Sequence, residues 1–153
     1  LIWYKRDLRV DDHPALTLGA EIGAVLPIYI VEPNYWALAD TSARQWRFLA
    51  QSLLGLKDDL AQLGLPLILR TGDAVAEHAK LCIKHGITKI ISHQETGNLF
   101  TFHRDRRGLN GLSWRNQVSH APLPHGMVGR KDICFSYARA KHTPSAHPSG
   151  ARG

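Results

Sequence analysis

Short apolar runs alternate along this chain with segments long enough to form helices, and this alternation constrains the fold more than any other feature. The runs span residues 1–4, 25–31, 67–70 and 89–93, and residues 112–114 are a candidate fifth. Apolar side chains on both faces are typical of parallel strands, which helical crossovers connect. The sequence therefore predicts an α/β fold, a doubly wound, Rossmann-like parallel sheet of five strands with helices on both faces.

The longest connecting segment predicts a helix over about residues 42–63, because its apolar side chains recur at steps of three and four residues. The repeat is too short for a coiled coil, so we interpret the stripe as part of the core. Asp12 and Pro14 predict the start of the first helix, and Asp73 and Gly86 the start and end of another. The stripe consists of Trp46, Leu49, Leu53, Leu56, Leu60 and Leu63.

Composition divides the chain into one domain, residues 1–130, and a tail. With 153 residues and 44% hydrophobic content, the chain can bury a core without disulfides or metals. Ser, His, Pro, Arg and Ala dominate residues 131–153, so this low-complexity tail is expected to be disordered. Five basic residues and one acid between residues 129 and 153 supply +4 of the net charge of +6. The basic character therefore belongs to the tail and indicates no nucleic-acid-binding face on the domain.

The sequence argues against several classes of protein. Cys82 and Cys134 form no Cys-x-x-Cys pair, so neither a disulfide framework nor a zinc motif is predicted, and a reducing, cytoplasmic setting is expected. No apolar stretch approaches the roughly 20 residues of a membrane span, and no signal peptide precedes the first strand. Because Leu1 is not a methionine, we interpret the chain as a piece of a larger protein. The sequence does not indicate its oligomeric state.

Ligands bind outside the carboxyl ends of the strands in open α/β sheets, so the loops that begin at Lys5, Glu32, Thr71 and His93 form the candidate site. Neither Gly-x-Gly-x-x-Gly nor Gly-x-x-x-x-Gly-Lys-Ser/Thr occurs, which argues against a classical nicotinamide dehydrogenase or a P-loop kinase. Asp73 lies in one of these loops. The candidate cofactor-binding residues are Arg6, Asp7, Glu32, His93 and Glu95.

Each candidate also has a structural interpretation. In Arg6-Asp7-Leu8-Arg9, guanidinium and carboxylate groups can pair and tie the loop to neighbouring backbone carbonyls. Glu95 can be a solvated acid or a helix N-terminal charge. The basic cluster at residues 104–107 could contact phosphates, but on a short helix we interpret it as a solvated face with local ion pairs. No serine or cysteine nucleophile is spaced with His93, and the histidines lack metal-ligand spacing, so neither a catalytic residue nor a metal site is predicted.

Residues 3–9, Trp-Tyr-Lys-Arg-Asp-Leu-Arg, are followed by Asp-His-Pro-Ala-Leu at residues 12–16. These segments resemble the amino-terminal signature of the DNA photolyase and cryptochrome family. His13 stands where the family usually has asparagine.

Two later segments extend this resemblance. Residues 28–33, with the capping run at 40–45, are similar to the family's second strand and the loop before its long helix. Residues 92–98, followed by Arg104-Asp105, resemble a His-Glu-Glu-Thr-Gly-Asn segment that ends in Arg-Asp. The match covers about residues 1–107.

The resemblance implies an antenna domain, which in many members holds a light-harvesting pigment such as a folate, a deazaflavin or a flavin nucleotide. Arg6 matches an arginine that contacts the pigment in deazaflavin-type members, and His93 falls beside that site. Folate-type members carry a histidine three residues after the tryptophan matched by Trp36, where this chain has Ala39. A deazaflavin or flavin mononucleotide (FMN) is therefore expected rather than a folate.

In this family the FAD, the tryptophans that reduce it and the DNA-lesion pocket lie in a larger helical domain, which nothing after Lys131 resembles. The complete protein is expected to be a light-driven DNA-repair lyase, a deoxyribodipyrimidine photo-lyase, and to bind DNA only when complete. This chain alone is expected to hold no FAD and to be inactive. The alternatives are a non-catalytic, cryptochrome-type blue-light signalling protein and a nucleotide-binding α/β module.

Overall fold

The structure is a computed structural model and describes residues 1–93, 95, 97–111, 114–117 and 132–137. The strands are β1 (Ile2–Tyr4), β2 (Pro27–Val31), β3 (Ile68–Thr71), β4 (Lys89–His93), β5 (Trp114–Gln117) and β6 (Asp132–Tyr137). The helices are α1 (Pro14–Ile22), α2 (Pro33–Trp36), α3 (Ala43–Gln62), α4 (Ala74–His85) and α5 (Leu99–Gly111).

The sheet has the strand order β3-β2-β1-β4-β6-β5. Among the described residues, four neighbouring strands, β3, β2, β1 and β4, are parallel, whereas β6 pairs antiparallel with both β4 and β5. The prediction of five parallel strands is therefore wrong in number. The fifth strand in sequence, β5, joins the sheet at its edge through the antiparallel strand β6.

Strand β6 lies inside the segment that was expected to be a disordered tail, so this expectation is wrong for Asp132–Tyr137. Ile133, Phe135 and Tyr137 alternate there with Asp132, Cys134 and Ser136, which is the period of two that characterises strands. The prediction missed this strand because the alternating segment is short and the residues that follow it are polar. The rest of the predicted tail lies outside the described residues.

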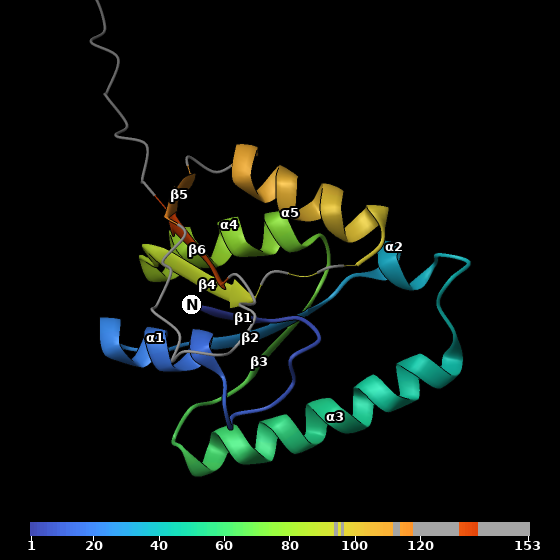
Figure 1. The fold of residues 1–153 in the computed structure, drawn as a ribbon, viewed down its shortest axis with the longest axis horizontal. Coiled ribbons are helices and arrows are strands. Elements are labelled where there is room, and N and C mark those ends of the chain that lie inside the picture. Colours follow the sequence, from blue (N-terminus) through green and yellow to red (C-terminus); the bar gives the residue numbers. More distant parts are fainter. Residues whose placement is uncertain (94, 96, 112–113, 118–131, 138–153) are drawn as a thin grey trace, which may run out of the picture.

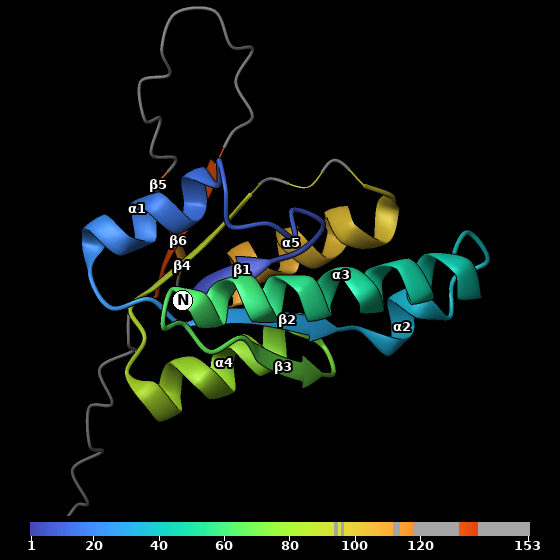
Figure 2. The same ribbon diagram turned by 90° about the horizontal axis from the view of Figure 1, so that it is seen from below.

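Helices cover both faces of the sheet, as predicted (Figure 1). Successive residues of β1 point to opposite faces, so Ile2 and Tyr4 pack with α1 and α3, whereas Trp3 packs on the other side with α4. Helix α5 lies beside α4. The view from below shows α3 running along the sheet (Figure 2). No helix in the described part of the chain is long and apolar enough to cross a membrane.

The helix starts at Asp73 and near residue 42 agree with the prediction, whereas the start at Asp12 does not. Ser42 and Asp73 cap α3 and α4 through their side-chain oxygens. At α1, however, His13 is the cap, and its Nδ1 accepts from the Leu16 N–H at 3.0 Å. Asp12 takes a left-handed conformation with φ 46°, which moves the cap position on by one residue.

The apolar stripe of α3 is core only in its middle. Leu53, Leu56 and Leu60 are buried, in agreement with the prediction. Trp46 and Leu63, at the two ends of the stripe, are 39% and 57% exposed.

The order of the parallel strands creates a switch point between β1 and β4. The chain moves outward from β1 to β3 and then returns through α4 to the other side of β1. The loops after β1 and β4 therefore diverge to opposite faces of the sheet, which leaves room for a ligand. Most of the predicted site residues lie in these two loops.

Candidate functional site

A cavity of about 490 Å³ lies at the carboxyl ends of β1 and β2. Helix α2 and the first half of α3 form one wall, and the loop after β4 together with α5 contributes the other. This volume is within the range of pockets that bind small molecules and cofactors. Its aromatic lining consists of Trp3, Tyr4, Tyr29, Tyr35, Trp36 and Phe48.

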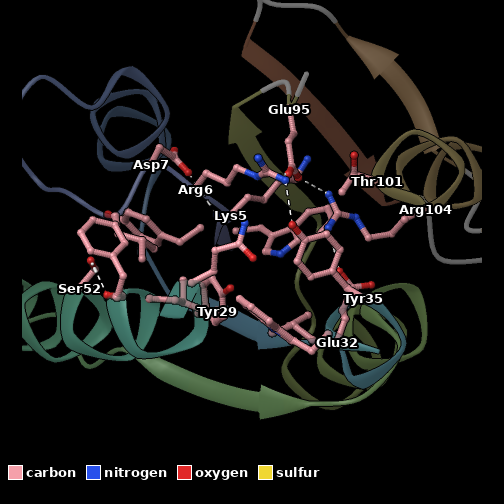
Figure 3. Close-up of a pocket in the computed structure, with 18 of the residues that line it drawn as sticks. Lys5, Arg6, Asp7, Tyr29, Glu32, Tyr35, Ser52, Glu95, Thr101 and Arg104 are labelled. Carbon is pink, nitrogen blue, oxygen red and sulfur yellow. Dashed lines mark hydrogen bonds and ion pairs between the residues drawn. The ribbon is translucent and has the colours of Figure 1, made fainter. Parts of the chain in front are cut away.

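Arg6 is the most exposed of the four cations that line the cavity, with 57% of its side chain accessible. Its Nε lies 2.6 Å from Glu95 Oε1, and its terminal nitrogen donates to the Tyr35 hydroxyl at 3.0 Å. Figure 3 shows these side chains converging from three different segments. The structural interpretation of residues 6–9 holds in part: Arg6 pairs with Glu95 outside the segment, whereas Arg9 donates to the Asp11 and Asp12 carbonyls and thus ties the loop to its own backbone.

Arg104 connects the acidic residues behind Arg6. Its guanidinium donates to Glu32 Oε2 at 2.7 Å and to Glu95 Oε2 at 2.6 Å (Figure 3). It also donates to Asp105 Oδ1 at 2.9 Å. Burial lowers the pKa of Arg104, but Asp105, Glu32 and Glu95 outweigh it and the pKa is raised. Burial also raises the pKa of Glu32, against the influence of Arg104. The network therefore holds a charged guanidinium inside the protein.

Arg104 corrects the interpretation of residues 104–107 as a solvated face, because it is only 6% exposed. Local spacing could not show this, since Glu32 lies 72 positions away. The Arg-Asp ending of the third resembling segment was the available signal. Farther along α5, Arg107 is half-exposed and pairs with Asp73 at 2.8 Å.

Lys5 is a second buried cation that sequence reasoning missed. Its Nζ donates to Asp105 at 2.8 Å and lies 4.3 Å from the centre of the Trp3 ring. Arg104 also stacks on Trp3, with 4.8 Å from Cζ to the ring centre. Burial lowers the pKa of Lys5, and Asp105 opposes this. These interactions fasten α5 to β1 and hold Trp3 in the cavity wall.

Asp7 and His93, predicted separately, meet beside the cavity. His93 Nδ1 contacts Asp7 Oδ2, and His13 Nε2 lies 2.7 Å from the same oxygen. Burial raises the pKa of Asp7, but hydrogen bonds from both histidines and from the Lys5 N–H lower it well below its usual range. The carboxylate is therefore ionised.

The structure thus divides the predicted site residues into two neighbouring groups. Arg6, Glu32 and Glu95 are linked through Arg104, whereas Asp7 and His93 form a separate cluster with His13. Asp73 belongs to neither group, because it caps α4.

Comparison with known proteins identifies relatives of this chain. The profile of the DNA photolyase family matches residues 1–107. The chain is 34% identical over 122 residues to the chloroplastic/mitochondrial cryptochrome DASH of Oryza sativa subsp. japonica, which covers 71% of this chain and 20% of that protein. It is 34% identical over 96 residues to the deoxyribodipyrimidine photo-lyase of Escherichia coli strain K12, covering 59% of this chain and 20% of that protein.

A bacterial class III photolyase from Agrobacterium tumefaciens has a similar structure, with a TM-score of 0.60 and 26% sequence identity over 72% of this chain and 23% of that one. Fold and cavity thus define an α/β domain with a ligand-sized site at its strand ends. The chain belongs to the DNA photolyase family. It spans about a fifth of the length of these curated relatives.

Proposed function

We propose that this chain is the antenna domain of a photolyase or cryptochrome and that the cavity at the ends of β1 and β2 seats the pigment. The observation that supports this is the combination of aromatic walls with an accessible cation, Arg6, the most exposed of the four cations that line the cavity. A planar heteroaromatic ring can stack on the aromatic side chains, and a guanidinium can pair with an anionic oxygen or phosphate. The residues present therefore fit a flavin-like pigment.

Within this class, a deazaflavin or FMN fits better than a folate. Lys5 and Arg104 are buried and engaged by Asp105, Glu32 and Glu95. Arg6 and Arg9 are exposed, with 57% and 43% of their side chains accessible, and a ligand can reach Arg6 by opening its pair with Glu95. Ala39 offers no side-chain hydrogen bond at the position where the resemblance implies a folate-binding histidine. The site therefore favours a pigment that carries its own negative charge.

In the complete protein, bound FAD would supply light-driven electron transfer to a pyrimidine dimer in DNA. Family membership and the photo-lyase among its relatives support this role. The cryptochromes among the relatives support a second candidate, blue-light signalling without repair. In either case this chain would contribute the antenna alone and would neither bind FAD nor repair DNA.

The direct test is a titration of FMN, a deazaflavin and a folate against the purified chain and its Arg6→Ala variant, followed by fluorescence. We expect FMN or the deazaflavin to bind more tightly than the folate. Removal of the charge-assisted hydrogen bond should cost about 1.5–3 kcal/mol, roughly 10- to 150-fold in Kd.

Lys80→Ala is the matched control, because it also removes an exposed cation in an ion pair, but on α4. It should leave pigment binding unchanged. If a folate binds tightly and Arg6→Ala leaves its affinity unchanged, the proposed pigment class is wrong. If no pigment binds, the antenna role is wrong.

A further inference from the structure

The Asp7, His13 and His93 side chains converge at the switch point of the sheet. Asp7 follows β1, His13 caps α1 and His93 ends β4, so three separate elements contribute one group each. One ligand atom from each side chain lies within 4.8 Å of the other two. The side chains are nearly inaccessible, with 8%, 0% and 11% of their surfaces exposed.

Hydrogen bonds do not satisfy this cluster completely. His13 Nε2 lies 2.7 Å from Asp7 Oδ2, the same oxygen that His93 Nδ1 contacts, so one carboxylate oxygen serves both imidazoles. Within the described part of the chain, the Tyr4 hydroxyl is buried without a partner, and its ring packs on His13 with centroids 4.8 Å apart. Buried polar atoms without partners are rare and commonly indicate a missing water or ion.

We propose that Asp7, His13 and His93 form a binding site for a divalent transition-metal ion, with Zn²⁺ as its simplest occupant. Two imidazoles and one carboxylate are a donor set that suits zinc and related first-row metals rather than magnesium or calcium. A water completes the coordination, and the Tyr4 hydroxyl is placed to hydrogen-bond to it. The site is structural and joins the loop after β1 to α1 and β4.

Metal binding changes the proton arrangement on His13. Without a metal, Nδ1 accepts from the Leu16 N–H, so the ring proton lies on Nε2. When the metal takes Nε2, the proton moves to Nδ1, where it would face the Leu16 N–H at 3.0 Å, so the imidazole must turn away from its capping position. The Leu16 N–H keeps a second acceptor, the His13 carbonyl at 3.0 Å. Metal binding therefore leaves this N–H bonded.

The test uses the tag-free full chain, stripped with a chelator and titrated with Zn²⁺ by calorimetry and with Co²⁺ by visible absorption. The wild type should bind one equivalent and give the intense d–d bands of Co²⁺ in a four- or five-coordinate site. His13→Asn removes a ligand but keeps a residue that caps helices well. It should weaken binding more than about 100-fold, beyond the 10- to 100-fold cost of losing an outer-shell partner.

His93→Gln is the second ligand variant and should weaken metal binding to a similar extent. His103 is an exposed histidine on α5, so His103→Gln should bind the metal as tightly as the wild type. Thermal melts of the metal-free proteins identify any variant that fails to fold. Unchanged affinity in both folded ligand variants, or no uptake of either metal by the wild type, would overturn the site. No pigment is used, so this result is independent of the antenna proposal.

Discussion

Arg104 is the residue on which the charged wall of the cavity depends most. It holds Glu32 and Glu95 inside the protein, and both carboxylates are almost inaccessible, with side chains 7% exposed. Removing one partner of a buried ion pair leaves a charge that is neither hydrated nor paired. Loss of Arg104 would therefore remove the guanidinium that pairs with the buried carboxylates of Glu32 and Glu95.

Arg104→Met should lower the free energy of unfolding by about 3–5 kcal/mol, measured by urea denaturation at neutral pH. Arg107→Met removes an exposed arginine, paired with Asp73, from the same helix. It should cost no more than about 1 kcal/mol. Equal effects of the two substitutions would show that the Arg104 network is not buried in solution.

His78 makes stability depend on pH. It is buried against Trp3, and burial, together with the charges of Lys5 and Arg104, lowers its pKa to about 3. The unfolded chain, with an ordinary histidine, takes up this proton below about pH 6.5. Stability from neutral His78 is therefore present above pH 6.5 and is lost as the pH falls toward 3.

The slope from this group is at most about 1.4 kcal/mol per pH unit. His78→Leu should flatten the stability profile between pH 6.5 and 4, as measured by urea melts at a series of pH values. His103→Gln, at an exposed position, should leave the profile unchanged. A profile with the same slope in His78→Leu would contradict a neutral, buried His78.

Among the elements, α1 depends on an unusual cap. An imidazole takes the place of the small polar side chains that commonly begin helices. The predicted start was one residue early because a sequence pattern does not show the φ of Asp12, which decides where the helix begins. The alternation of apolar runs, in contrast, was enough to place the four parallel strands, since buried strands require it.

His13→Ala should destabilise the protein by about 0.5–2 kcal/mol, the usual cost of removing a cap, when the metal-free proteins are compared by thermal or urea unfolding. His13→Asn should recover most of this stability, because an asparagine side chain can accept from the same N–H. If the two substitutions are equally harmful, the His13 ring stabilises α1 by packing rather than by capping.

At the scale of the whole molecule, the site unites residues that are far apart in sequence. Arg6, Glu32 and Glu95 were predicted because parallel strands end at one edge of the sheet. The links that join them, above all Arg104 and Lys5, were not predicted, because pairs 72 and 100 residues apart leave no local pattern. The convergence of His13 with His93 was missed for the same reason.

Charge at this scale predicts weak DNA binding by the isolated chain. Residues 138–153 contain Arg139, Lys141 and Arg152 and no acid, which is half of the net charge of +6. A chain ending at Tyr137 keeps β6 and should bind DNA more weakly at low salt. The slope of log K against log salt should fall by about 0.9 for each phosphate that the shortened chain no longer neutralises. Equal affinity of the two chains, measured by fluorescence anisotropy, would place the basic surface on the folded domain.

The most direct measurement of the antenna role is a crystal structure of the chain grown with FMN. We expect the isoalloxazine ring in the cavity at the ends of β1 and β2, against Tyr35 and Phe48, with the phosphate on Arg6 and the Arg6–Glu95 pair opened. A ring bound elsewhere, for example in the groove between Trp36 and Trp46, would contradict this seat. A cavity that stays empty at saturating FMN and deazaflavin would contradict the antenna role itself.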